Sequence, residues 1–122
     1  MFRNMVFNVY AKNRDDPAKN HTLLMHAEGR WSLSPTYDLT FSSGPGGENC
    51  TVVAGQGRGP GMDHLLTISR GASISDHAAK DIIEQLRAAV RCWSHFAESA
   101  LLSKSSAAEL DRIFNAGEPR SP

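Results

Sequence analysis

The sequence of 122 residues contains only two cysteines, Cys50 and Cys92, and they do not form a C-x-x-C pair. A structural zinc site needs about four Cys or His ligands, so this pattern excludes one and favours two reduced thiols. The sequence also lacks a basic-then-apolar leader and any apolar run near the ~20 residues that a membrane-spanning helix needs. These absences predict a cytoplasmic protein with no membrane partner.

Neither sign of charge is in excess, because 13 Lys and Arg residues balance 13 Asp and Glu residues. This balance gives no overall attraction to nucleic acid, so we expect no direct nucleic-acid partner and only a local charged site. The five histidines show no metal-ligand spacing such as H-E-x-x-H. Apolar residues make up 40% and charged residues 21%, which is ordinary for one soluble domain.

Apolar residues at helical spacing predict a mainly α-helical fold. The first helix has an apolar stripe and ends near Lys12, before Pro17; its stripe comprises Phe2, Met5, Val6, Val9 and Tyr10. Further helices are expected from Met62, from an N-cap at Ser75 and continuing past Trp93 across a bend, and from Ser103 or a capping box at Ser106. Gly117 is the expected stop, which gives a domain over residues 1–117 and a disordered tail over 118–122.

A small β-hairpin interrupts the helices. Two short apolar runs, 22–25 and 31–33, flank a turn at residues 28–30. The glycine-rich segment that follows, residues 42–61, contains neither G-x-x-x-x-G-K-[ST] nor G-x-G-x-x-G. It therefore predicts a flexible loop, with a short strand over residues 51–53, and not a phosphate-binding loop.

The polar loop at residues 13–20 is the one segment whose pattern points to chemistry. Asp15 and Asn20 are five residues apart, and Asp38 follows 18 residues after Asn20, beyond the hairpin. Phosphoryl transfer by protein kinases uses a D-x-x-x-x-N loop and a later magnesium-binding aspartate in this order, and Lys19 could reach a phosphate. Spacing alone leaves two alternatives open. One is a polar turn in which Asp15 or Asp16 bonds its own backbone, and the other is an unrelated helical protein with a chance motif.

Three stretches of text carry a resemblance to a known family. They read M-V-F-N-V at 5–9, N-R-D-D-P-A-K-N-H at 13–21 and W-S-L-S-P-T-Y-D-L at 31–39. They resemble, at similar spacing, the F-N-V, D-D/G-H-x-K-N and W-x-L-S/A-P-x-Y-D-L/I series in the C-terminal half of HipA-family serine/threonine kinases, the toxins of type II toxin–antitoxin modules. The likeness runs over most of the chain and extends to the helix around Trp93.

The resemblance implies the C-terminal lobe of a kinase-like fold, largely helical, and a role for five residues. By that likeness, Asp15 is the catalytic base, and Asn20 and Asp38 bind Mg²⁺. Lys19 and Tyr37 would line the phosphates of ATP. The substrate would be a protein involved in translation, such as an aminoacyl-tRNA synthetase.

Two features depart from the family pattern. Pro17 stands where the family has a histidine beside the catalytic aspartate. Only 14 residues precede Asp15, and they hold no glycine-rich loop, strand and lysine for clamping ATP. We therefore expect a lobe that binds ATP and Mg²⁺ weakly or not at all and is inactive without a separate N-terminal lobe. The alternative is a non-enzymatic pseudokinase module that binds a HipB-like antitoxin or another protein.

A lobe without its cover should also expose apolar side chains. Met1, Phe2 and Phe7 at the start of the first helix are the candidates. Because large exposed apolar patches usually mark interfaces, we expect a two-fold homodimer through this surface.

Overall fold

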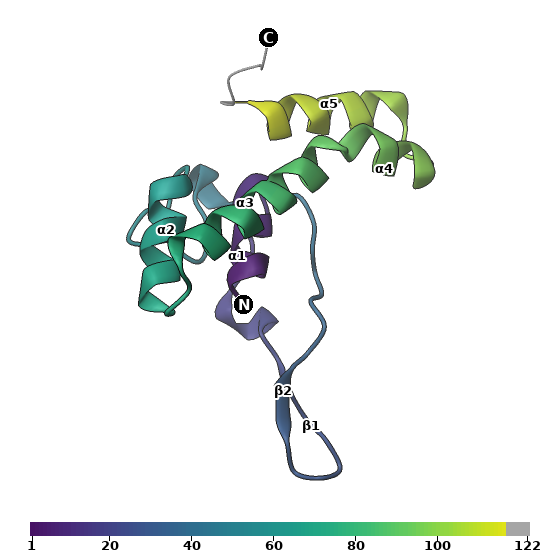
Figure 1. Cartoon of the computed structure of the whole chain (residues 1–122). Coiled ribbons are helices and arrows are strands. Elements are labelled where there is room, and N and C mark those ends of the chain that lie inside the picture. Colours follow the sequence, from purple (N-terminus) through teal and green to yellow (C-terminus); the bar gives the residue numbers. More distant parts are fainter. Residues whose placement is uncertain (117–122) are drawn as a thin grey trace.

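The computed structural model describes residues 1–116 and is mainly helical (Figure 1). The long helix α3 (Asp76–Arg91) crosses the molecule and contacts α1 (Phe2–Tyr10) and α2 (Met62–Gly71), which together form the helical body. Beyond the body, α4 (Trp93–Ser99) pairs with α5 (Lys104–Asn115), and we call these two the C-terminal helix pair. The prediction of a mainly α-helical fold is confirmed.

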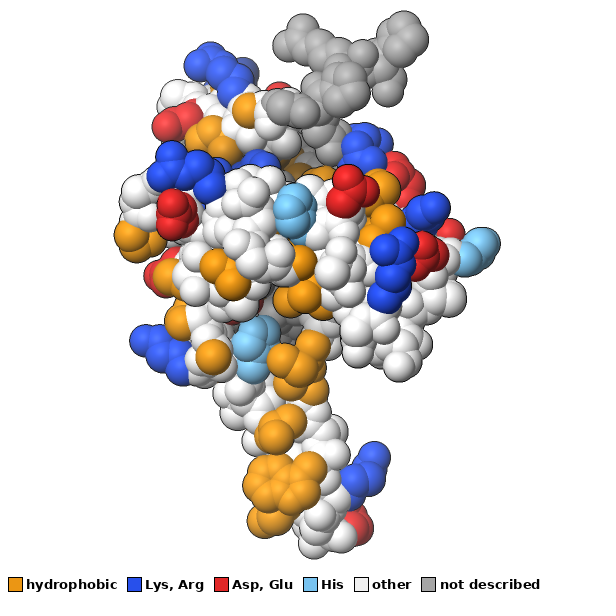
Figure 2. Space-filling view, turned by 90° about the vertical axis from the view of Figure 1, so that its left-hand side faces the viewer, with side chains coloured by type: hydrophobic (Ala, Val, Ile, Leu, Met, Phe, Trp, Pro, Cys, Tyr) orange, Lys and Arg blue, Asp and Glu red, His pale blue; other side chains and the backbone are white. Residues whose placement is uncertain are grey.

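The predicted β-hairpin is present and forms a two-stranded sheet. Strands β1 (Leu23–Met25) and β2 (Trp31–Leu33) pair antiparallel, with Leu23 opposite Leu33 and Met25 opposite Trp31. The hairpin projects from the body (Figure 1), and apolar side chains lie open along it (Figure 2). Leu23, Met25 and Trp31 are each at least 60% exposed, so the hairpin adds little to the core.

The core lies inside the helical body. Its buried members come from α1, α2, α3 and one residue of the glycine-rich segment: Val6, Val9, Val53, Leu65, Leu66, Ala79 and Ile83. The predicted stripe of the first helix supplies Val6 and Val9, and Phe2 packs on the cluster as a half-buried neighbour. Burial of such side chains contributes roughly 1.5–3 kcal/mol each, so this cluster holds α1 and α2 against α3.

Serine side chains cap the starts of α3 and α5. The hydroxyl of Ser75 accepts a hydrogen bond from the amide of Ala78 at 3.3 Å, which confirms the predicted N-cap. Ser103 caps α5 in the same way, because its hydroxyl accepts from the amide of Ser106 at 3.1 Å. The helix therefore takes the earlier of the two predicted starts, and the capping box at Ser106 was wrong. Cys92 separates α3 from α4 and provides the expected bend. The predicted stop at Gly117 and the predicted tail lie outside the described residues.

The glycine-rich segment folds against the polar loop and not into a strand. Residues 51–53 form no ladder, and Val53 makes only an isolated bridge with Gln56, so the predicted strand was wrong. The physical reason is a tight turn, in which the amides of Val53 and Gln56 each donate to the carbonyl of the other at 3.0 Å. The segment is held on the polar loop by two further hydrogen bonds. The amide of Cys50 donates to the carbonyl of Arg14 at 2.8 Å, and the hydroxyl of Thr51 donates to the carbonyl of Asp16 at 2.7 Å.

Two further properties concern the surface. Along residues 1–116, each helix is too short or too polar to cross a bilayer. At the start of α1, Met1 is 70% exposed and Phe2 and Phe7 are half-buried, as predicted. The apolar hairpin exposes more large apolar side chains than this helix end does.

Candidate active site

The polar loop leaves α1 through a tight turn. Lys12 has a positive φ of 53°, and the amide of Asn13 donates to the carbonyl of Asn8 at 2.9 Å. Pro17 then starts the short 3₁₀ helix η1 (Ala18–Asn20) with φ −70° and ψ 158°. The fixed φ of proline suits this extended position before a helix, so the loop accepts Pro17 without strain.

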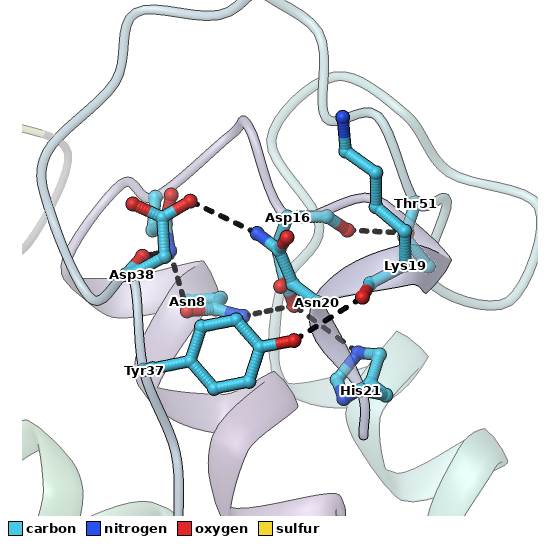
Figure 3. A network of polar contacts seen from close by, with 9 residues as sticks. Asn8, Asp16, Lys19, Asn20, His21, Tyr37, Asp38 and Thr51 are labelled. Atoms are coloured by element: carbon cyan, nitrogen blue, oxygen red, sulfur yellow. Dashed lines mark hydrogen bonds and ion pairs between the residues drawn. The ribbon is translucent and has the colours of Figure 1, made fainter.

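Asn20 and Asp38 meet across the hairpin, as the sequence predicted. The Asn20 side-chain amide Nδ2 donates to Asp38 Oδ2 at 3.0 Å (Figure 3). Beside them, the Tyr37 hydroxyl donates to the carbonyl of Lys19 at 3.2 Å and shares a hydrogen bond of 2.7 Å with the hydroxyl of Thr22. These contacts fasten η1 to the segment that follows β2.

The two neighbouring aspartates have different surroundings. Asp15 is exposed, and its Oδ1 accepts a hydrogen bond from the Cys50 thiol at 3.5 Å. Asp16 is half-buried, and its Oδ2 accepts from Asn8 Nδ2 and lies 3.5 Å from Nε2 of His21 (Figure 3). The Asp16 carboxylate is therefore occupied by contacts within the protein, whereas the exposed Asp15 carboxylate can be reached by a ligand or substrate.

The pKa of the Cys50 thiol reflects the negative charge of the neighbouring aspartates. Its pKa is raised, first because the thiol donates a hydrogen bond to Asp15, and further by desolvation and by the negative charges of Asp15 and Asp16. A carboxylate that accepts from a thiol favours the protonated thiol. The glycine-rich segment thus brings a neutral donor, and not a cation, to the Asp15 carboxylate.

Asp38 and Asn20 together offer a partial set of magnesium ligands. Mg²⁺ prefers oxygen ligands, keeps several waters and is commonly held by one or two carboxylates together with substrate phosphates. The carboxylate of Asp38 fits this role directly, and the amide oxygen of Asn20 fits it after a turn of the amide plane, since Nδ2 now faces Asp38. Among residues 1–116, no group of three or more His, Cys, Asp or Glu side chains could hold a metal. A metal here therefore takes its remaining ligands from water or from phosphate oxygens.

Within residues 1–116, two predicted side chains make no hydrogen bond to the others: that of Asp15, which contacts Cys50, and that of Lys19. The Lys19 side chain is exposed, and its ammonium group points away from Tyr37 in Figure 3. Its backbone carbonyl, in contrast, lies inside the site as the acceptor of the Tyr37 hydroxyl. A long flexible side chain can turn toward a phosphate without any change of the loop.

Two buried asparagines belong to the site, and the sequence motifs did not single them out for it. Asn13 Nδ2 donates to Asn8 Oδ1 at 3.1 Å and to the backbone carbonyl of Asp38 at 3.3 Å. A signal was present, because Asn8 is the polar member of the row Met5, Val6, Phe7, Asn8 and Val9 in α1. A polar residue in such a row usually has a specific partner.

Comparison with known proteins identifies a family for the chain. The family model of the HipA-like C-terminal domain matches residues 1–93, which is more than half of the chain and includes the polar loop, the hairpin and Asp38. The chain belongs to the HipA-like C-terminal domain family. No curated protein and no solved structure matches the chain.

Proposed function

We propose that this chain is the C-terminal catalytic lobe of a cytoplasmic HipA-like protein serine/threonine kinase. The observation that carries the proposal is the 3.0 Å contact between Asn20 Nδ2 and Asp38 Oδ2, which joins two motif residues from opposite sides of the hairpin. Asp15 stands on the same loop as Asn20. Phosphoryl transfer needs this combination of a base and oxygen ligands for the metal on the nucleotide phosphates.

Asp15 is the proposed general base. In the transfer, a substrate hydroxyl oxygen bonds to the γ-phosphorus of ATP, the bond from that phosphorus to the β–γ bridging oxygen breaks, and ADP leaves. The hydroxyl proton passes to the Asp15 carboxylate. Its exposure suits this role, because the hydroxyl of a protein substrate must reach it. Asp16 is less suited, since its Oδ2 already accepts from Asn8 and faces His21.

Asn20, Asp38, Lys19 and Tyr37 are the proposed nucleotide-binding residues. Asp38 and Asn20 would hold Mg²⁺, which supplies positive charge to the phosphates. The Lys19 ammonium adds a second positive charge, and Tyr37 holds η1 in place through the carbonyl of Lys19. Asp38 and Asn20 offer two ligand groups at most, so we expect weak ATP binding unless a separate N-terminal lobe covers the site.

The test is the transfer of γ-phosphate from labelled ATP and Mg²⁺ to protein hydroxyl groups. The chain is assayed alone and mixed with the N-terminal lobe of a HipA-like kinase. We expect label transfer in the mixture, none with the chain alone, and none in a mixture that carries Asp38→Ala. Absence of transfer in every mixture, with binding of the two lobes verified, would contradict the proposal.

A second candidate function is a non-enzymatic module that binds an antitoxin or another protein. The exposed hairpin favours it, because Leu23, Met25 and Trp31 form an open apolar surface, and such surfaces usually mark interfaces. Pro17 in place of the family histidine also favours it. If this is the function, a HipB-like antitoxin will bind the native chain and Asp15→Asn equally, and Met25→Ser with Trp31→Ser will weaken the complex.

A further inference from the structure

Two asparagine side chains, Asn8 and Asn13, are buried at the edge of the core. They are 7% and 2% exposed, and Ser69 is the only other buried polar residue among residues 1–116. Ser69 satisfies its hydroxyl within its own helix, by donating to the carbonyl of Leu66. Burying an amide is costly unless it is hydrogen-bonded. The Nδ2 groups of Asn8 and Asn13 donate to the candidate site and Asn8 Oδ1 accepts from Asn13, while the buried Asn13 Oδ1 has no partner among residues 1–116.

The two amides form a continuous link between the polar loop and the segment after the hairpin. Asn8 Nδ2 donates to Asp16 Oδ2 (Figure 3), and Asn8 Oδ1 accepts from Asn13 Nδ2 at 3.1 Å. The same Asn13 nitrogen donates to the carbonyl oxygen of Asp38 at 3.3 Å. Asp16 and Asp38 are thus connected through two side-chain amides, that of Asn8 in α1 and that of Asn13 at the start of the polar loop.

Asp38 needs such support because of its backbone. Its φ is 57°, in the left-handed region, where a residue with a Cβ is strained, although aspartate is strained less than most. The carbonyl that Asn13 holds belongs to this same residue. Asn20 holds the carboxylate end at 3.0 Å, and the amide of Ser42 donates to the carbonyl of Lys12 at 3.1 Å further along. Asn13 is the buried side chain that fixes the backbone of Asp38.

We infer that Asn13 is a positioning residue for the Asp38 carboxylate, and that Asn8 transmits the same constraint to Asp16. This inference rests on the proposed function, since it assigns Asp38 to the metal. Without Asn13, Asp38 can relax out of the left-handed region and carry its carboxylate away from Asn20. Without Asn8, the direct bond from Asn13 to Asp38 remains. The two variants therefore have different effects at the metal ligand, although they delete the same chemical group.

The test uses Mn²⁺ as the probe, with the full chain and no activity assay. Paramagnetic broadening of the Asn20 side-chain amide and the Asp38 backbone signals measures Mn²⁺ affinity, even when binding is weak. Loss of a residue that orients a metal ligand costs about 10–100-fold in affinity. We expect Asn13→Ala to weaken Mn²⁺ binding about tenfold or more, and Asn8→Ala to change it much less. Asn49→Ala is the matched control, because Asn49 Nδ2 also donates to a loop carbonyl, that of Gly57, and touches neither aspartate.

The outcomes distinguish failure of the positioning role of Asn13 from failure of the proposed metal site. If Mn²⁺ broadens these signals in the native chain and not in Asp38→Ala, while Asn13→Ala matches the control, the positioning inference is overturned and the proposed metal site stands. If Mn²⁺ does not gather at Asp38 in the native chain, both are overturned. Circular dichroism verifies the fold of each variant. Should Asn13→Ala be unfolded, Asn13→Leu keeps about the same size, removes the donor without adding a charge beside the metal, and must show the same weakened affinity relative to Asn49→Ala.

Discussion

The helical body and the C-terminal helix pair are built differently. The core cluster lies entirely within α1, α2, α3 and Val53, whereas Ala97 is the only buried hydrophobic residue between Trp93 and residue 116. Within the pair, Phe114 of α5 meets Trp93 of α4 edge-on at 5.2 Å between ring centroids, and outside it Phe114 meets Phe41 at 6.3 Å. The family model ends at Trp93, where the body gives way to the pair.

This difference shows where the candidate site gets its rigidity. Asn8 lies in α1 and the polar loop follows this helix, which contributes Val6 and Val9 to the core. The site is therefore supported by the most buried part of the molecule, while the C-terminal pair covers one side of the body. Changes in the body should disturb the site and the fold together, and changes in the pair should be local.

The largest effect is expected from Ile83→Ala in the body. Ile83 is fully buried in the cluster, and truncation of such a residue costs about 2–5 kcal/mol in the free energy of unfolding. Leu101→Ala in the pair is the comparison, because Leu101 is 91% exposed and should change stability by at most about 0.5 kcal/mol. Urea denaturation measures both, and similar losses in the two variants would refute the contrast.

The next largest loss of stability is expected where the glycine-rich segment packs against the polar loop. Gly44 has φ 68°, and a Cβ there would lie 2.2 Å from the carbonyl oxygen of Glu48 and 2.8 Å from Cβ of Arg14. Gly44→Ala should therefore destabilise the protein by about 2 kcal/mol or more, through strain and collision. Gly46→Ala is the control, because Gly46 has φ 62° with nothing within 4 Å, and it should cost about 1 kcal/mol. Thermal melts giving equal losses would show that the segment does not pack on the loop in this way.

A smaller and more local effect is expected from Phe114→Ala in α5. Its edge-on contacts with Trp93 and Phe41 contribute about 0.5–1.5 kcal/mol each. Their loss should allow α5 to unfold locally while α1, α2 and α3 stay folded. Hydrogen exchange would then accelerate at the α5 amides and remain unchanged at those of α3. Uniform acceleration over all helices would instead mean that the pair and the body unfold as one unit.

The two cysteines offer the mildest comparison, since one lies at the site and the other between body and pair. Both are exposed free thiols. The hydrogen bond to Asp15, followed by desolvation and the nearby charges, raises the Cys50 pKa, so less thiolate is present at a given pH and alkylation is slowed. Asp15→Asn removes a negative charge and should lower that pKa, which speeds alkylation of Cys50 at mildly alkaline pH. Mass spectrometry of the two labelled peptides measures this, with Cys92 as the unchanged internal control.

Local signals in the sequence predicted most of the elements, and long-range contacts explain what it did not predict. The stripe from Phe2 to Tyr10 and the cap at Ser75 depend on neighbours within one or two turns, so they were predictable. The approach of Asn20 to Asp38 followed from the hairpin between them. The path of the glycine-rich segment did not, because Cys50 meets Asp15 and Thr51 meets Asp16 across 35 residues without any periodic pattern. The role of Asn13 was missed for the same reason, since Asp38 lies 25 residues further along the chain, whereas the partner of Asn8, Asp16, is only 8 residues away.

The central claim, that the polar loop carries the base of a phosphoryl transfer, is tested most directly by exchanging each aspartate for asparagine. The measurement is the rate of phosphate transfer by the chain together with an N-terminal lobe. Removal of a general base costs about 10²–10⁴-fold, so Asp15→Asn should lose nearly all activity, and Asp16→Asn should lose much less because an asparagine can still accept from Asn8. The opposite ranking, with Asp16→Asn inactive and Asp15→Asn close to native, would contradict the account.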